Sequence, residues 1–212
     1  EYWNNNNNDI NYEGEYINGE RNGKGKEYND AGELIYEGEY KNGERNGKGK
    51  EYCEGKIIFE GEYNNGKKKG KGKEYYNNGN IKFEGEYINE EKNGKGKEYY
   101  RDGKLQFEGE YLNNKKWNGK GYSKLNNIEY ELIKGKGYIK EYDDYGKLIF
   151  EGEYINGERN GKGKEYNKDK LIFEGEYING KRNGKGKEYN IEGKLKFEGE
   201  YLYNKRLRGK EY

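Results

Sequence analysis

The sequence lacks several residue types on which most enzyme active sites depend. Histidine and threonine are absent, and Ser123 and Cys53 are the single serine and the single cysteine. Arrangements of a nucleophile, a base and an orienting residue therefore lack their usual members. One cysteine also excludes an internal disulfide, which fits a reducing compartment inside the cell. The composition thus predicts a protein that is not an enzyme and that holds no cofactor.

Methionine and proline are also absent, and apolar residues are few. Without a methionine, Glu1 is not a translational start, so we expect the 212 residues to be a segment of a longer chain. Hydrophobic residues make up 29% of the sequence and charged residues 39%, and the mean hydropathy is −1.62. This balance excludes a thick, closed core, and no apolar run approaches the roughly 20 residues of a membrane-spanning helix. The net charge of +1 makes nucleic acid an unlikely partner.

Aromatic residues, by contrast, are abundant and periodic, with 26 tyrosines and 6 phenylalanines. An aromatic residue followed by Glu-Gly-Glu-Tyr recurs at intervals of 23 or 24 residues, after an asparagine run (Asn4–Asn8) that predicts a flexible connector. The copies begin near Tyr12, Tyr36, Phe59, Phe83, Phe107, Phe150, Phe173 and Phe197, with a degenerate copy near Tyr130. Such a period is typical of repeat arrays in which each unit packs on its neighbours. We therefore interpret residues 1–212 as one array of about nine repeats.

Each copy predicts a β-hairpin. Apolar residues alternate with glutamates, as over residues 148–154, so the two kinds of side chain occupy opposite faces of a strand. Asn-Gly pairs such as Asn179 and Gly180 follow, and both residues accept the positive φ of a tight reversal. Glycine recurs too often for helices. The fold class predicted is all-β, an elongated, twisted antiparallel ribbon of hairpins without helix.

The return strand of each hairpin carries two glycines. We predict that Gly23 and Gly25 make room for the rings of Tyr12 and Tyr16 on the preceding strand. Alternation then places the intervening lysines on the same face as the glutamates, where cross-strand ion pairs form. Strict alternation also places Tyr28 on this charged face, whereas a bulge would turn it to the aromatic face. The sequence leaves both placements open.

The array is interrupted between residues 111 and 142. The fifth copy adds Trp117 to its first loop, and the degenerate sixth copy, which begins near Tyr130, loses Glu-Gly-Glu-Tyr. One interpretation is a shortened hairpin that bends the ribbon. The other is a docking surface made of exposed Trp117, Leu132 and Ile133.

The repeated motif resembles a known family. Tyr-Glu-Gly-Glu-Tyr, then Asn-Gly, then Gly-Lys-Gly, at a period of about 23, is similar to the MORN repeat over nearly the whole chain. The resemblance implies a ribbon of β-hairpins. It also implies a scaffold or tether at membranes or the cytoskeleton, in some members joined to an enzyme domain.

The first-turn loops contain more lysine and arginine than glutamate, which predicts a basic edge suited to an anionic membrane surface or an acidic protein. A solvated loop edge without a partner explains the same pattern. The residues of this edge are Arg21, Arg45, Lys67, Lys68, Lys69, Lys115, Lys116, Arg159, Lys181, Arg182, Lys205 and Arg206.

These observations favour a non-catalytic structural or scaffolding protein with protein partners, inside the cell and associated with cytoskeleton or membrane. The alternatives are an anionic-lipid-binding tether, a regulatory array attached to an enzyme domain, and self-association through unpaired sheet edges. No small-molecule substrate is expected. The pair Asp143 and Asp144 lacks the spacing of a calcium loop, so no metal site is predicted.

Overall fold

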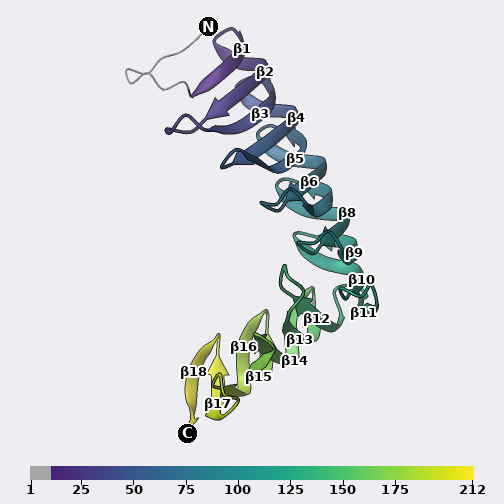
Figure 1. Cartoon of the computed structure of the whole chain (residues 1–212), viewed down its shortest axis with the longest axis vertical. Coiled ribbons are helices and arrows are strands. Elements are labelled where there is room, and N and C mark those ends of the chain that lie inside the picture. The colour runs from purple at the N-terminus through teal and green to yellow at the C-terminus, as the bar shows by residue number, and fades with distance from the viewer. Residues whose placement is uncertain (1–10) are drawn as a thin grey trace. The chain divides into compact units, whose positions relative to one another are not determined.

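The computed structural model describes residues 11–212, and the asparagine run Asn4–Asn8 lies outside this range. The described residues form antiparallel strands and turns, without helix, as predicted. Contacts divide the chain into two compact units, residues 1–103 and 104–212, which are considered separately here. Within each unit, strands follow one another in sequence order (Figure 1). Across the described residues there is no helix long and apolar enough to cross a membrane.

The first unit contains strands β1 to β8, each hydrogen-bonded to the next along the chain. They are β1 (Tyr12–Ile17), β2 (Glu20–Tyr28), β3 (Leu34–Lys41), β4 (Glu44–Cys53), β5 (Lys56–Asn64), β6 (Lys67–Tyr75), β7 (Ile81–Ile88) and β8 (Glu91–Tyr99).

The second unit contains strands β9 to β18, and its pairing is interrupted once, between β11 and β12. The strands are β9 (Leu105–Leu112), β10 (Lys115–Tyr122), β11 (Ile128–Leu132), β12 (Gly137–Tyr142), β13 (Leu148–Ile155), β14 (Glu158–Asn167), β15 (Lys170–Ile178), β16 (Lys181–Tyr189), β17 (Leu195–Leu202) and β18 (Lys205–Glu211). The interruption falls on the degenerate copy, where a single bridge joins Ile133 to Lys136.

The first turn of each hairpin has the backbone conformation that its sequence predicts. Asn179 and Gly180, between β15 and β16, have φ values of 49° and 78°. Two consecutive positive φ values suit the tight turn whose twist matches that of the flanking strands. The pair at Asn113 and Asn114 adopts the same conformation, with φ values of 50° and 66°, although it contains no glycine. Asparagine tolerates this region, so the loss of glycine there leaves the turn intact.

Aromatic rings from successive hairpins pack edge to face on one side of the sheet. The ring of Phe173 contacts Tyr177 of its own strand at a centroid distance of 5.7 Å and Tyr201 of the next hairpin at 5.1 Å. All three side chains are buried. A Cβ atom at Gly186, on the strand beside Phe173, would lie 2.6 Å from Cζ of that ring. The prediction that glycines make room for rings is confirmed at such positions.

We expect Gly186→Ala to lower the free energy of unfolding by about 1 to 3 kcal/mol, because the added methyl group forces a buried ring to move. Chemical denaturation measures this loss. Gly180→Asn is the matched control, since Gly180 has no atom within 4 Å of a Cβ position and asparagine accepts its φ of 78°. An equal loss in both variants would show that backbone conformation, and not the ring, sets the requirement for glycine.

The other glycine of the return strand has a different role from the predicted one. Gly23 has a φ of 69°, and a Cβ atom there would meet the carboxylate of Glu15, with Cδ at 2.6 Å, and not the ring of Tyr16. The strand register shifts between Gly14 and Tyr16, so β2 carries extra residues opposite Glu15. The Glu15 carboxylate accepts a hydrogen bond from the backbone N–H of Lys24 at 3.1 Å. This glycine therefore makes room for a carboxylate that caps a bulge.

The opposite face of the sheet carries the predicted lysines and glutamates. Glu13 lies opposite Lys26, and Lys24 lies opposite Glu39 on the next hairpin. The hydroxyl of Tyr28 donates to Glu13 at 3.1 Å, which places this tyrosine on the same face. We call this side the charged face.

Tyr36 stands where Phe59 and Phe83 stand in later copies, and its hydroxyl is buried with no hydrogen-bond partner among the described residues. We expect Tyr36→Phe to raise the free energy of unfolding by about 1 kcal/mol, because it removes an unsatisfied polar group without changing the ring. The control is Tyr63→Phe. The Tyr63 hydroxyl donates to Glu51 at 2.9 Å, so its removal should destabilise by about 1 kcal/mol. Thermal unfolding of both variants gives the comparison, and a loss of stability in Tyr36→Phe contradicts the prediction.

Candidate functional site

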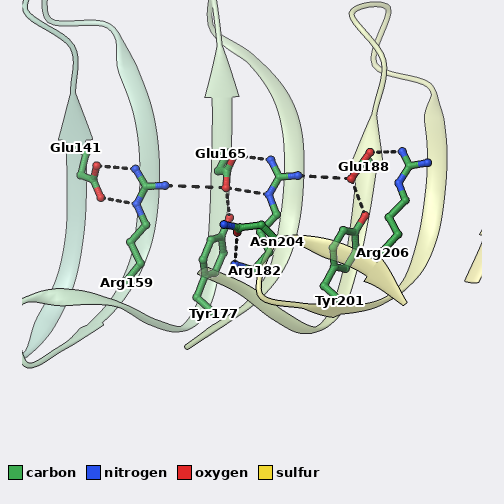
Figure 2. Close-up of polar contacts among 9 residues, drawn as sticks. All are labelled: Glu141, Arg159, Glu165, Tyr177, Arg182, Glu188, Tyr201, Asn204 and Arg206. Carbon is green, nitrogen blue, oxygen red and sulfur yellow. Dashed lines mark hydrogen bonds and ion pairs between the residues drawn. The ribbon is translucent and has the colours of Figure 1, made fainter. Parts of the chain in front are cut away.

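A row of alternating arginine and glutamate side chains crosses the aromatic face of the second unit (Figure 2). Arg159 donates two hydrogen bonds of 2.7 Å to Glu141, and Arg182 donates to Glu165 at 3.0 and 2.6 Å. Each arginine also approaches the glutamate of its own hairpin, with Arg159 3.9 Å from Glu165 and Arg182 3.5 Å from Glu188. Every glutamate of the row therefore joins two hairpins. We call this row the packed-face ladder.

The rings beneath the ladder hold it in place. The guanidinium carbon of Arg182 lies 4.1 Å from the centroid of the Phe173 ring, within the range of a cation–π contact. The hydroxyl of Tyr177 donates to the same Glu165 carboxylate at 2.7 Å. Tyr201 makes the equivalent hydrogen bond to Glu188 at 2.9 Å. Each carboxylate thus accepts from both arginine and tyrosine (Figure 2).

These contacts change the acidity of the ladder glutamates. Burial by itself raises the pKa of Glu165, but hydrogen bonds from Arg182 and Tyr177 outweigh it and lower the pKa below the usual value. The pKa of Glu188 is lowered against burial in the same way, by Arg206 and Tyr201. Both groups are therefore carboxylates at neutral pH, and the neighbouring arginines balance their negative charges.

The same arrangement is present in the first unit. Glu27 lies 2.9 Å from Arg21 and 2.6 Å from Arg45, and Glu51 lies 2.9 Å from Lys68. The guanidinium carbon of Arg45 lies 4.0 Å from the centroid of the Tyr36 ring. The hairpin of β5 and β6 has Lys68 at the position where several other hairpins have arginine, and this lysine forms the same kind of ion pair.

The structure separates the predicted basic edge into two groups. Those that pack over aromatic rings are Arg21, Arg45, Lys68, Lys116, Arg159, Arg182 and Arg206. The remaining five are exposed: Lys67, Lys69, Lys115, Lys181 and Lys205. The ammonium nitrogen of Lys181 also lies 5.6 Å from the centroid of the Tyr203 ring. Lys115 forms an ion pair of 2.7 Å with Glu158. Several cations of the first group pack over rings and are neutralised by glutamates. The basic edge therefore attracts an anionic partner less strongly than its number of lysines and arginines suggests.

Sequence reasoning missed the ladder glutamates, although a signal for them was present. Gly25 faces the ring of Tyr12, so Glu27, two residues further along the same strand, faces the same way. Glu27 also follows Arg21 by six residues, and this spacing recurs between Arg182 and Glu188.

The predicted docking discontinuity is only partly exposed. Leu132 retains 2% of its accessible surface, so the expectation that it is exposed is wrong. It lies opposite Gly119 in the strand register, and its Cδ2 atom would lie 3.5 Å from a Cβ atom at Gly137. Ile133 is exposed at 63%, and Trp117 is half-buried against Gly135, whose N–H donates to the Trp117 carbonyl oxygen at 2.7 Å. These contacts give the degenerate copy a packed turn, and a docking role for Ile133 stays a prediction.

A groove of about 800 Å³ lies on the charged face across β14 to β18, and Tyr138 of β12 is also part of its lining. Its floor is the backbone of the central residue of each strand, because the Cβ position of that residue points to the opposite, aromatic face. These central residues are Gly163, Gly175, Gly186, Gly199 and Gly209. The rings occupy the other side of this floor. Its first rim consists of Lys164, Glu174, Lys187 and Glu198, and its second rim of Lys162, Glu176, Lys185 and Glu200, with Arg208 at the end. The groove is therefore one side chain deep and lined by both charge signs.

Six segments of the chain match the model of the MORN repeat: residues 12–32, 36–55, 59–81, 83–104, 150–170 and 173–191. Together they make up more than half of the sequence. The chain belongs to the MORN-repeat family. The MORN match does not confirm the predicted count of about nine, because three of the predicted copies lie outside it: the fifth, the degenerate sixth and the last, in residues 105–149 and 192–212. A comparison with curated proteins gives no match.

MORN repeats generally mediate interactions with proteins or membranes, and the chemistry of this array agrees with such a role. Within residues 11–212, no group of three or more histidine, cysteine, aspartate or glutamate side chains is arranged to hold a metal ion. The sheet of β12 to β18 carries a neutralised ladder on one face and a charged groove on the other.

Proposed function

We propose that this MORN array is a non-catalytic scaffold that holds protein partners on its charged face. The observation that carries the proposal is the groove across β14 to β18, which has room for a ligand and a floor without side chains. Pockets of 300 to 1,000 Å³ are the usual size of ligand sites. We place this scaffold inside the cell, at the cytoskeleton or at a membrane.

The rigidity of the floor supports this function. Ladder contacts join each hairpin to the next on the opposite face, with Glu165 between Arg159 and Arg182. A preorganised surface loses little conformational entropy when a partner binds. Successive hairpins therefore present their charged side chains at fixed intervals.

Site-specific photo-crosslinking in cells tests the proposal. A photoreactive residue in place of Lys185, on the second rim, should form discrete adducts with protein partners. The control is the same residue in place of Lys194, whose side chain is 76% exposed but lies in a turn outside the groove. Absence of protein adducts specific to position 185 would overturn the proposal.

A second candidate function, an anionic-membrane tether, is favoured by a strip at the first-turn edge of the second unit. Here exposed aliphatic residues lie directly opposite lysines: Leu112 and Lys115, Ile133 and Lys136, Ile178 and Lys181, Leu202 and Lys205. Paired aliphatic and basic side chains suit the interface of an acidic membrane.

Liposome co-sedimentation separates this candidate from the first. A tether should sediment with vesicles that contain phosphatidylserine at low salt, less at high salt, and not with neutral vesicles. Lys181→Glu combined with Lys205→Glu should abolish this binding. If the unaltered chain stays in solution with acidic vesicles at low salt, the membrane candidate is removed.

A further inference from the structure

The groove has a repeat distance as well as a shape. Lys162 on β14 and Lys185 on β16 occupy the same position in successive hairpins, two strands apart. Neighbouring strands lie about 4.7 to 4.9 Å apart, so equivalent side chains recur every ~9.4 to 9.8 Å along the groove. A bound chain that makes the same contact with each hairpin must share this period.

The three regular polypeptide conformations differ in how well they meet this condition. A polyproline II helix has three residues per turn and rises about 3.1 Å per residue, so it presents equivalent side chains every ~9.3 Å. A β-strand returns to the same side every ~6.7 Å, which does not match. An α-helix is about 10 to 12 Å wide with its side chains, whereas the two rims arise from residues two apart on one strand, ~6.7 Å. The polyproline II conformation fits the period.

The lining of the groove contains five cationic side chains and four glutamates, and most of the glutamates have close partners. Arg208 holds Glu200 through hydrogen bonds of 2.9 and 2.8 Å, and the Glu176 carboxylate accepts the Lys185 backbone N–H at 3.2 Å. On the first rim, Lys187 lies 3.5 Å from Glu198. Among the ion pairs of the described residues, none includes Lys162 or Lys185, and both side chains are exposed. Lys162 and Lys185 lie opposite Glu176 and Glu200 in the strand register, so the second rim offers one exposed ammonium group per hairpin that is not in direct contact with a carboxylate.

We propose that this groove binds a polyproline II segment of a protein partner that carries an acidic residue at every third position, one turn of the ligand per MORN repeat. The inference rests on the proposed scaffold function and names its ligand class. The acidic side chains pair with Lys162 and Lys185, the second residue of each turn contacts the first rim, and the third faces solvent. Five strands span about 19 Å, which corresponds to two turns, or about six residues.

Two synthetic peptides of identical composition test the period. The first is three repeats of Asp-Pro-Pro, and the second has the same three aspartates at alternate positions, followed by the remaining prolines. Both have equal charge and both favour polyproline II, so only the spacing of the acids differs. Fluorescence anisotropy with the whole chain at low salt should show about two- to fivefold tighter binding of the first peptide, since one exposed ion pair is worth at most about 1 kcal/mol.

Variants of the chain locate the binding. Lys162→Glu combined with Lys185→Glu should weaken binding of the first peptide at least about tenfold, an effect that corresponds to about 1.4 kcal/mol. Lys168→Glu combined with Lys194→Glu changes the net charge equally outside the groove and should leave binding unchanged. Circular dichroism verifies that both double variants keep the sheet.

The outcomes distinguish this inference from the proposed function. Equal affinity for the two peptides, or equal loss in both double variants, overturns the match of one turn per repeat. If protein adducts still form at position 185, the scaffold function stands and only the ligand class is wrong. If neither peptide binds and no adduct forms, both proposals fail.

Discussion

Above pH 10 the array is expected to unfold completely, in a transition that coincides with ionisation of its buried tyrosines. Tyr177 and Tyr201 are buried and donate hydrogen bonds to Glu165 and Glu188. Burial, followed by these hydrogen bonds, raises the pKa of both hydroxyls above the ordinary value of 10.0. On the charged face, burial and a hydrogen bond to Glu174 raise the pKa of Tyr189 to about 12.

The direction of the pH dependence follows from these raised values. The unfolded chain releases its tyrosine protons near pH 10, whereas the folded chain retains them to higher pH. The stability that depends on the protonated hydroxyl is therefore complete below pH 10 and is lost as the pH rises through the folded-state pKa. A phenolate beside a ladder carboxylate also places two negative charges in contact. Because the arrangement recurs in most hairpins, the losses add up along the sheet.

Absorbance of tyrosinate and far-ultraviolet circular dichroism, recorded together from pH 7 to 12.5, measure this transition. We expect both signals to change steeply at the same pH, above 10, and to recover on return to neutral pH. The urea-unfolded chain is the control and should titrate gradually around pH 10. Gradual ionisation near pH 10 of the folded chain, with the sheet signal unchanged, would contradict the prediction.

Glu165→Gln should have the largest effect of any single substitution in the ladder, a loss of about 2 to 3 kcal/mol in the free energy of unfolding. The substitution keeps the shape of the side chain but leaves Arg159 and Arg182 without their shared carboxylate. The side chains of this cluster are 19 to 25% exposed, so the uncompensated charge remains largely shielded from water. Tyr177 also loses a charged acceptor.

Urea denaturation at pH 7 gives the magnitude, and Glu198→Gln is the matched control. Glu198 is 47% exposed and lies 3.5 Å from Lys187 on the charged face, so its loss should cost less than about 1 kcal/mol. The pKa of Glu165 is lowered in the folded state, so its contribution is present above the unfolded value of 4.5 and is lost as the pH falls through the folded value. The Glu165→Gln variant should therefore lose less stability on acidification than the unaltered chain. Equal losses in the two variants at pH 7 would exclude the ladder as a main source of stability.

The fold could be predicted because each hairpin is specified locally. Alternation over residues 148–154 sets the faces of β13, and Asn179 with Gly180 sets the turn between β15 and β16. Such features depend on residues close in sequence, and their repetition fixes the pairing order. The family resemblance and the all-β architecture followed from them.

The faces of individual residues could be predicted only where no bulge intervenes. The extra residues at Asn22 and Gly23 displace Gly23 onto the Glu15 carboxylate, whereas Arg21, four residues before Gly25, stays on the aromatic face. The count of loop residues therefore indicated a basic edge, although alternation along β2 places Arg21 over the ring of Tyr12. The glutamates that neutralise the basic edge, such as Glu27, lie near the C-terminal end of the return strand.

The groove could not be predicted, because it depends on how side chains from several paired strands line up across the sheet. The sequence indicated that Gly186 admits a ring on the aromatic face. That the side chains of Lys185 and Lys187 form opposite rims of a channel on the other face follows only from the pairing of the strands. Leu132 illustrates a similar limit, since its burial depends on the packing of the degenerate copy.

The sharing of each ladder carboxylate between two hairpins bears on how such a sequence changes length over generations. Glu165 lies 3.9 Å from Arg159 of its own hairpin and accepts hydrogen bonds from Arg182 of the next, and Glu188 is shared in the same way one hairpin later. One regular copy can therefore follow another with its charges matched. Unequal recombination that adds or deletes a whole regular period leaves the new junction chemically equivalent, whereas an exchange out of phase separates an arginine from its acceptor.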